Sequence, residues 1–400
     1  MIDFRRFPGR RWPLVLFGFI CVFWGNFGQS FFVGVYGESF KSTLQLNASQ
    51  YGAVYSLATF AAGFIFLFAG VWIDRIPLRQ FALVAGVGLA SACLVLAWSN
   101  SVFLLFIGLF LVRLFGQSLL PHTGMITMAR SFHRDRGKAL GAAASAVPLG
   151  EIVLPLLAIV LIARVGASSS WLIFAIAVFV LYFPLVLFLL KKDWLDSAEE
   201  SETEHGDTAE ISGRFALLKT RRFWFVLPAL LFGPFVVTGI FIHQDYVLQV
   251  KAWAGALWAS AFVLYGIVHW VASFIVGVLI DRYSAQHLLP WYNLPTLLAL
   301  LVLLFVAPAY SVLLFLGLLG FAIGFGGPIG AALWAELYGK KHLGGIRSMV
   351  AAFTVVATAI SPILFGLAID MSLTFTSIVY STLVLGVSVC LLAALAFRKS

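Results

Sequence analysis

Twelve apolar segments, each long enough to cross a membrane as a helix, dominate this chain of 400 residues. A membrane-spanning helix needs about 20 consecutive, mostly apolar residues. The chain is 62% hydrophobic and 11% charged, whereas soluble domains carry roughly 25% charged residues. The sequence therefore predicts an all-α membrane protein with twelve transmembrane helices. They are expected near residues 13–36, 50–72, 80–98, 101–127, 139–163, 171–190, 223–247, 255–280, 287–306, 309–335, 344–369 and 373–397.

The basic residues between these segments predict the topology. Of the 26 Lys and Arg residues, 22 lie in the termini and loops on the side of the N-terminus. Only Lys41, Arg164 and Lys251 lie on the other side, and Arg113 lies inside a segment. Because Lys and Arg gather in cytoplasmic loops, both termini are expected in the cytoplasm. The formal net charge of +9 therefore reports topology, and no nucleic-acid partner is expected.

A short motif occurs twice and relates the two halves of the chain. The sequences Gly70–Arg75 (GVWIDR) and Gly277–Arg282 (GVLIDR) each close an apolar segment, and 207 positions separate them. Pro155 and Pro362 have the same offset. Such self-similarity in a mostly apolar chain indicates a duplicated membrane transporter.

The one long polar segment, residues 191–222, lies midway between the repeats. Its stretch from Asp196 to Glu210 holds seven acidic residues and no Lys or Arg. A segment of this composition cannot bury enough apolar surface to order itself. It is interpreted as a flexible cytoplasmic linker between a six-helix half at 1–190 and a second at 223–400; a regulatory docking segment is the alternative.

The chain has six plus six spans, a central loop, and a G-x-x-x-D-R loop after the second and after the eighth span. In these features it resembles the major facilitator superfamily. The resemblance implies that spans 1, 4, 7 and 10 line a central cavity. The loop motif of the family has a second glycine, which is replaced here by the run Ile76-Pro77-Leu78. The motif residues are expected to act in gating, by charge clusters that form in one conformation and break in another, or else to anchor the topology. They are Gly70, Asp74, Arg75 and Arg79 in the first half, and Gly277, Asp281 and Arg282 in the second.

Three segments are more specifically similar to the monocarboxylate and oxalate–formate porters and their bacterial relatives. These segments are Asn26–Phe32, Arg113–Gln117 and Arg136–Gly141. Carriers of that branch have an Asp and, four residues later, an Arg in span 8. Here His269 and Ser273 occupy those positions, so the arginine that binds carboxylate in span 8 of those carriers is absent.

Two charged residues lie where lipid would otherwise be expected. Arg113 is about midway along span 4, and Glu151 about midway along span 5. A charge at the bilayer centre costs on the order of 3 kcal/mol, so each needs a partner or a watery cavity. Either the two neutralise each other and hold two helices together, or Arg113 binds an anionic cargo while Glu151 carries a proton. Gln117, one turn after Arg113, shares its face.

The remaining candidates are polar residues in other spans. His269 is either a proton relay and cargo contact or a packing residue. His243 and Asp245 form either an outer vestibule or an interfacial pair. In span 1, Asn26, Gln29 and Tyr36 follow helical spacing and share one face, which either contacts cargo or joins helices.

The sequence contains no phosphate-binding loop and no spacing typical of a metal or nucleophile–base site, so no enzyme activity, cofactor or metal is expected. We predict a monomeric secondary transporter of the bacterial inner membrane. It would move a small solute by alternating access, as a symporter of a small organic anion with protons. The alternatives are a proton-coupled exporter of a metabolite, siderophore or drug-like compound and, in a different class, a polytopic receptor or membrane enzyme.

Overall fold

A computed structural model describes residues 12–69, 73, 75–132, 135–191, 218, 220–339 and 343–397. Almost all of these residues are helical, and none of them lies in a β-strand. Eleven helices are long and apolar enough to span a membrane, and the bent pair Trp12–Gly28 and Ser30–Leu44 makes a twelfth. Helices satisfy their own backbone hydrogen bonds, which a lipid environment demands. The predicted all-α membrane fold is confirmed.

The chain forms two compact units. Unit 1 comprises residues 1–46 and 57–206, and unit 2 comprises residues 47–56 and 207–400. Helix α4 (Ala48–Ala69) therefore begins in unit 2 and continues in unit 1. The predicted linker, residues 191–222, lies largely outside the described residues, so its flexibility stays a prediction.

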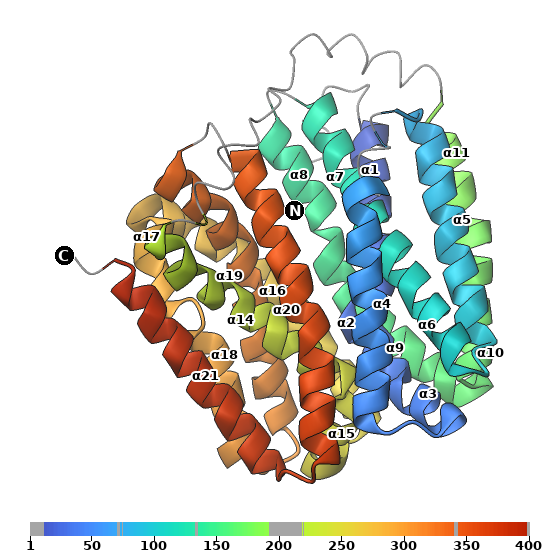
Figure 1. Ribbon diagram of the computed structural model, residues 1–400. Helices are drawn as coiled ribbons and strands as arrows, with labels where there is room; N and C mark the ends of the chain where they lie inside the picture. The colour runs from blue at the N-terminus through green and yellow to red at the C-terminus, as the bar shows by residue number, and fades with distance from the viewer. Residues whose placement is uncertain are drawn as a thin grey trace. The chain divides into compact units, whose positions relative to one another are not determined.

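Unit 1 contains the remainder of α4 and the helices that correspond to the other first-half spans (Figure 1). They are α1 (Trp12–Gly25), η2 (Asn26–Gly28), α2 (Ser30–Val33), η3 (Gly34–Tyr36), α3 (Gly37–Leu44), α5 (Leu78–Ala97), α6 (Val102–Leu111), η5 (Val112–Leu119), α7 (Leu120–Ser131), α8 (Arg136–Ala144), α9 (Ala146–Val165), α10 (Ala167–Ala177), η6 (Val178–Tyr182) and α11 (Phe183–Leu189).

Aromatic side chains fill the interior of unit 1. Helix α1 packs on α7, and α5 packs on α10. The Phe27 ring lies 5.0 Å from that of Phe32 and 5.2 Å from that of Phe174. Trp171, which is fully buried, continues this cluster at 5.5 Å from Phe32. Edge-to-face packing of such large rings fixes the first span against α10.

Unit 2 contains the helices of the second-half spans (Figure 1). They are α14 (Arg221–Ile242), α15 (Gln244–Lys251), α16 (Gly255–Tyr283), α17 (Ala285–Leu288), η7 (Leu289–Trp291), α18 (Leu294–Phe305), α19 (Ser311–Tyr338), α20 (Leu343–Asp370) and α21 (Phe375–Leu395).

Close backbone contact joins α16 to α19 in unit 2. A Cβ atom on Gly324 of α19 would lie 2.5 Å from the carbonyl oxygen of His269 on α16. Small residues of this kind let membrane helices approach closely. Helix α18 packs on α21 in unit 2, the same pairing of third and sixth spans that α5 and α10 make in unit 1, as the sequence repeat predicts.

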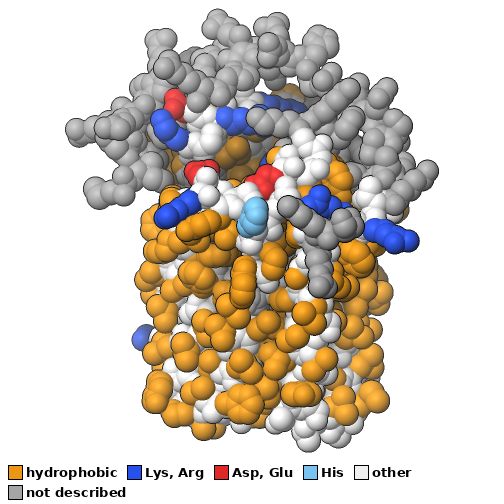
Figure 2. All heavy atoms as spheres, turned by 90° about the vertical axis from the view of Figure 1, so that its left-hand side faces the viewer, with side chains coloured by type: hydrophobic (Ala, Val, Ile, Leu, Met, Phe, Trp, Pro, Cys, Tyr) orange, Lys and Arg blue, Asp and Glu red, His pale blue; other side chains and the backbone are white. Residues whose placement is uncertain are grey.

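Apolar side chains face outward as well as inward. Phe64, Phe103 and Val278 are 62%, 69% and 70% exposed. On the face drawn in Figure 2, charged side chains gather near one end while hydrophobic side chains cover most of the rest. Such a surface is typical of helices that contact lipid, where the tails are as apolar as Leu.

Candidate substrate-binding site

The first span of unit 1 is broken in its middle. Trp12–Gly28 and Ser30–Leu44 meet at 47°, and Gln29 between them has extended dihedral angles of φ −78° and ψ 149°. The Asn26 side chain replaces part of the lost backbone bonding, since its Nδ2 donates to the oxygens of Phe23 at 3.1 Å and Ala146 at 3.0 Å. The prediction of one continuous helical face through residues 26–36 is wrong, because the extended residue Gln29 interrupts the helical register.

A π-helix packs against this break. Residues Val112–Leu119 form η5 in the middle of the fourth span, and π-bulges of this kind frequently occur at functional sites. The two segments touch at glycine. A Cβ on Gly28 would overlap the backbone nitrogen of Gln117 and lie 2.5 Å from the oxygen of Val112, while a Cβ on Gly116 would lie 2.9 Å from the nitrogen of Gly28.

The π-helix directs two polar side chains at the break. Arg113 is 3% exposed, and its Nη1 donates to the carbonyl oxygen of Gly28 at 2.9 Å. One turn later, Nε2 of Gln117 approaches Oε1 of Gln29 at 3.4 Å. Both glutamines are only half-buried. The structure therefore brings Arg113, Gln117 and Gln29 together, as the sequence suggested, with the two amides more accessible than the guanidinium.

Helix α9, which carries Glu151, packs against the same break. Glu151 is 3% exposed. The preceding residue, Gly150, packs so closely on Asn26 that a Cβ there would overlap the Asn26 amide. The break in span 1 is thus flanked by α9, which bears a buried acid, and by η5, which bears a buried base. We name Asn26, Gln29, Arg113, Gln117 and Glu151 the unit 1 polar cluster.

Tyr36 lies apart from this cluster. Its hydroxyl group shares a 2.7 Å hydrogen bond with that of Ser170, and its ring lies 4.5 Å from that of Trp171. The side chain is fully buried. In this conformation Tyr36 therefore packs the first span against α10.

His269 lies in unit 2, where its helix is held to α19. Its backbone oxygen accepts a bond from Oγ of Ser273 at 2.9 Å, and the same hydroxyl is 3.3 Å from the oxygen of Gly324. The His269 side chain is half-buried and lies at 6.4 Å from the ring of Tyr265. Ser273 therefore acts as a link between α16 and α19.

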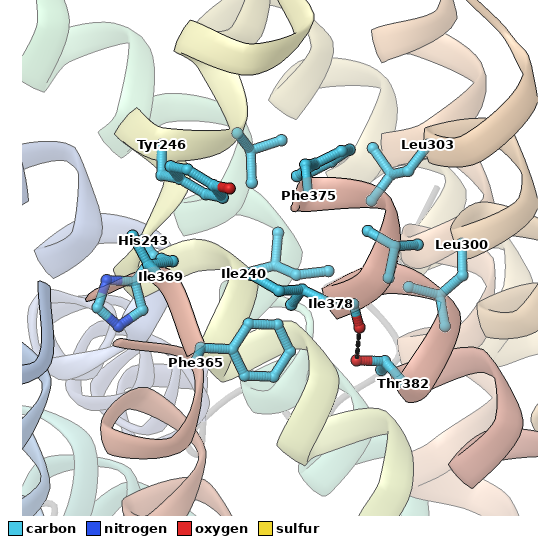
Figure 3. Close-up of a pocket in the computed structure, with 12 residues that line it drawn as sticks. Ile240, His243, Tyr246, Leu300, Leu303, Phe365, Ile369, Phe375, Ile378 and Thr382 are labelled. Atoms are coloured by element: carbon cyan, nitrogen blue, oxygen red, sulfur yellow. Dashed lines mark hydrogen bonds between the residues drawn. The ribbon is translucent and has the colours of Figure 1, made fainter. Parts of the chain in front are cut away.

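His243 and Asp245 lie at the junction between α14 and α15. The Nε2 atom of His243 is 2.8 Å from the oxygen of Pro362, and the residue is 1% exposed. Figure 3 shows its ring at the edge of a small pocket whose other walls are mostly apolar. This pocket holds about 20 Å³, room for roughly one water molecule, so it is too small for a cargo. The proposed outer vestibule stays a prediction.

The repeated loop motif is only partly visible. Gly70 and Asp74 lie outside the described residues, whereas Arg75 and Arg79 are exposed. In the second copy, Asp281 and Arg282 are exposed, and a Cβ on Gly277 would meet no atom within 4 Å. Gly277 therefore makes no close helix contact with the described residues in this conformation. The gating role of the motif stays a prediction.

Sequence reasoning missed a larger cavity in unit 2. It holds about 460 Å³ and is lined from α14, α19 and α20 and by Tyr292. The glycine-rich run of α19 forms one wall, and Arg347 provides the charge. The glycine run in the sequence could have indicated this cavity, because residues without side chains leave space between packed helices. No group of three or more His, Cys, Asp or Glu residues in the described part of the chain could hold a metal ion.

One family model, matched over two stretches of the chain, shows the family to which the chain belongs. The family model of the Major Facilitator Superfamily matches residues 15–264 and 246–400. The chain belongs to the major facilitator superfamily. It is therefore a multi-pass integral membrane transporter for a small-molecule substrate, and not an enzyme, as predicted.

Solved structures agree on the fold. The nucleoside transporter NupG has a TM-score of 0.74 at 15% identity, covering 98% of this chain and 100% of that one. A point mutant of NupG scores 0.75 at 14% identity, covering 96% and 100%. A bacterial homolog of the human lysosomal transporter Spinster, inward-facing and occupied, scores 0.72 at 14% identity, covering 96% and 97%. No curated protein matches the chain.

Proposed function

We propose that this transporter carries a small organic anion together with protons, and that the unit 1 polar cluster forms its recognition site. The observation that supports the proposal most is the position of Arg113. Its guanidinium is buried beside the break of a membrane-spanning helix. Broken helices of this kind commonly form substrate and ion sites in secondary transporters.

The chemistry of the cluster suits an anion. A guanidinium has five N–H donors in a planar fork that matches a carboxylate, and Nη1 of Arg113 donates to the carbonyl oxygen of Gly28. The half-buried amides of Gln29 and Gln117 can donate further hydrogen bonds. Helix Ser30–Leu44 begins at the break, and the first N–H groups of a helix lack intrahelical acceptors and favour negative charge.

The sequence difference in span 8 also favours a site at Arg113. The porters that the chain resembles hold carboxylate with an arginine where Ser273 stands here. Ser273 instead bonds the oxygens of His269 and Gly324 and has no charge to offer. An anion therefore needs another cation, and Arg113 is the basic residue buried within a span.

Glu151 is the group proposed to carry the proton. It lies on α9, one residue after the glycine that packs on Asn26, so movement at the break in span 1 changes the surroundings of its carboxylate. Arg113 and Glu151 lie on two segments, η5 and α9, that both contact the break in span 1. We therefore propose that cargo binding at Arg113 and proton binding at Glu151 are coupled through this break.

A ligand-induced stabilisation assay tests the cargo class. The purified full-length protein is heated with acetate, lactate, pyruvate, oxalate, uridine or choline at about pH 5.5 and 7.5. A ligand that binds the folded state raises the midpoint of unfolding. We expect carboxylates to raise it most at the lower pH, and Arg113→Gln to remove the effect. Stabilisation by uridine or choline alone would contradict the proposal.

A further inference from the structure

The large cavity of unit 2 exists because α19 lacks side chains where it faces α20. A Cβ on Gly327 or Gly330 would meet no atom within 4 Å. By contrast, a Cβ on Gly326 would lie 2.9 Å from the hydroxyl oxygen of Tyr292. The volume of about 460 Å³ falls within the range of roughly 300–1,000 Å³ that is usual for small-molecule sites.

The lining is mostly apolar, with three polar side chains (Tyr292, Trp334 and Thr354) and one charged residue, Arg347. Leu230 and Pro234 of α14, Ile323 of α19 and Val350 of α20 contribute aliphatic surface. Arg347 is exposed, and its Nη2 donates to the oxygen of Ala331, which also lines the cavity, at 3.0 Å. This bond holds the guanidinium next to a lining residue of the cavity. The other N–H groups of the guanidinium can donate hydrogen bonds to a ligand.

The wall also includes a buried aromatic residue. Trp334 lines the cavity and is 1% exposed. The described lining residues include no Asp or Glu. The cavity therefore offers a cation to a ligand, together with a mostly apolar wall.

We propose that this cavity binds an organic monoanion with an apolar or aromatic body, its carboxylate on Arg347 and its body against α14 and α19. The inference rests on the proposed function and adds to it a second anion site that prefers a larger anion. An ion as small as acetate would leave most of the volume empty, whereas an arylalkyl carboxylate fills it. Arg347 would thus be a second anion-binding residue, in the other half of the protein from Arg113.

Calorimetric titration of the full-length protein tests the site. Phenylacetate is compared with phenylacetamide, which has the same shape without the charge, and with acetate, which lacks the ring. We expect phenylacetate to bind about ten-fold or more tightly than either, as one charge-assisted contact allows. Arg347→Gln should remove the preference over the amide, and Gly330→Leu should weaken both aromatic ligands by filling the cavity.

A matched control separates the cavity from a general effect of a leucine on a membrane helix. A Cβ on Gly255, outside the cavity, also meets no atom within 4 Å, so Gly255→Leu should leave binding unchanged. If neither Arg347→Gln nor Gly330→Leu alters the affinity, the site is overturned.

The site and the proposed function can fail separately. Binding that depends on Arg347 supports the site, whatever the uptake assay shows. Unchanged proton-driven uptake by Arg113→Gln protein would count against the proposed function alone. Conversely, uptake that depends on Arg113, combined with phenylacetate binding indifferent to Arg347, overturns the cavity and leaves the function standing.

Discussion

The Nη1 atom of Arg113 donates to the carbonyl oxygen of Gly28 at 2.9 Å, so the buried guanidinium of the fourth span holds the break of the first. A carbonyl oxygen at a helix break has lost its intrahelical donor, and a charged donor compensates well in a medium of low polarity. A carboxylate that replaces this carbonyl on Arg113 would loosen the break. The same residue can thereby recognise the cargo and respond to it.

Arg113→Lys should retain the protein in the membrane but reduce anion uptake by about ten-fold or more, because an ammonium lacks the planar fork. Arg113→Gln should abolish uptake. Both variants are measured in proteoliposomes, with monodispersity on size-exclusion chromatography as the check on folding. Full uptake in well-folded Arg113→Gln protein would show that the guanidinium is structural.

Glu151→Gln should separate exchange from accumulation. The neutral amide mimics a protonated carboxyl group, so cargo should still exchange across the membrane without carrying a proton. We expect counterflow of labelled cargo to persist while an imposed pH gradient no longer drives accumulation. If the variant instead fails to fold, Glu151 is a structural residue, and the proton-carrier role is contradicted.

Gly28→Ala should disrupt the packing of the break on the π-helix. The added Cβ would overlap the Gln117 backbone nitrogen and crowd the Val112 oxygen, and backbone atoms cannot move aside as a flexible side chain can. We expect a lower thermal midpoint and reduced uptake. Gly141→Ala is the matched control, because a Cβ on Gly141 meets no atom within 4 Å. Equal behaviour of the two variants would refute the close contact.

Asp370→Ala should weaken the start of helix α4. The Asp370 carboxylate accepts bonds from the backbone N–H groups of Ala48 at 3.2 Å and Ser49 at 2.7 Å. Loss of such a cap costs about 0.5–2 kcal/mol, which should appear as a lower unfolding midpoint, while Asp370→Asn should retain part of the stability. No difference between Asp370→Ala and the wild type would mean that the cap is immaterial.

The sequence predicts the spans and the repeat because both depend on local composition. Twenty apolar residues in a row form a helix in lipid whatever their neighbours, and the two copies of the G-x-x-x-D-R motif can be recognised from the sequence letters alone. The position of Arg113 and Glu151 within spans was visible for the same reason, since charge is rare there.

What the sequence did not predict depends on contacts between distant segments. The extended residue Gln29 and the π-helix at Val112–Leu119 fit each other at Gly28, and neither segment alone carries a strong breaking signal. Likewise, Asp370 and Glu336 each cap a helix start far away in the chain. Asp370 accepts from the N–H groups of Ala48 and Ser49, and Glu336 from those of Ala285 and Gln286.

The most direct test of the account is uptake of labelled lactate into proteoliposomes that are acidic outside and neutral inside. Protein-free liposomes correct for passive entry of the uncharged acid. We predict accumulation several-fold above this baseline, lost when the pH gradient is collapsed and absent in Arg113→Gln. Lactate at the baseline level with wild-type protein, together with gradient-driven movement of neutral or cationic compounds, would contradict proton-coupled anion transport.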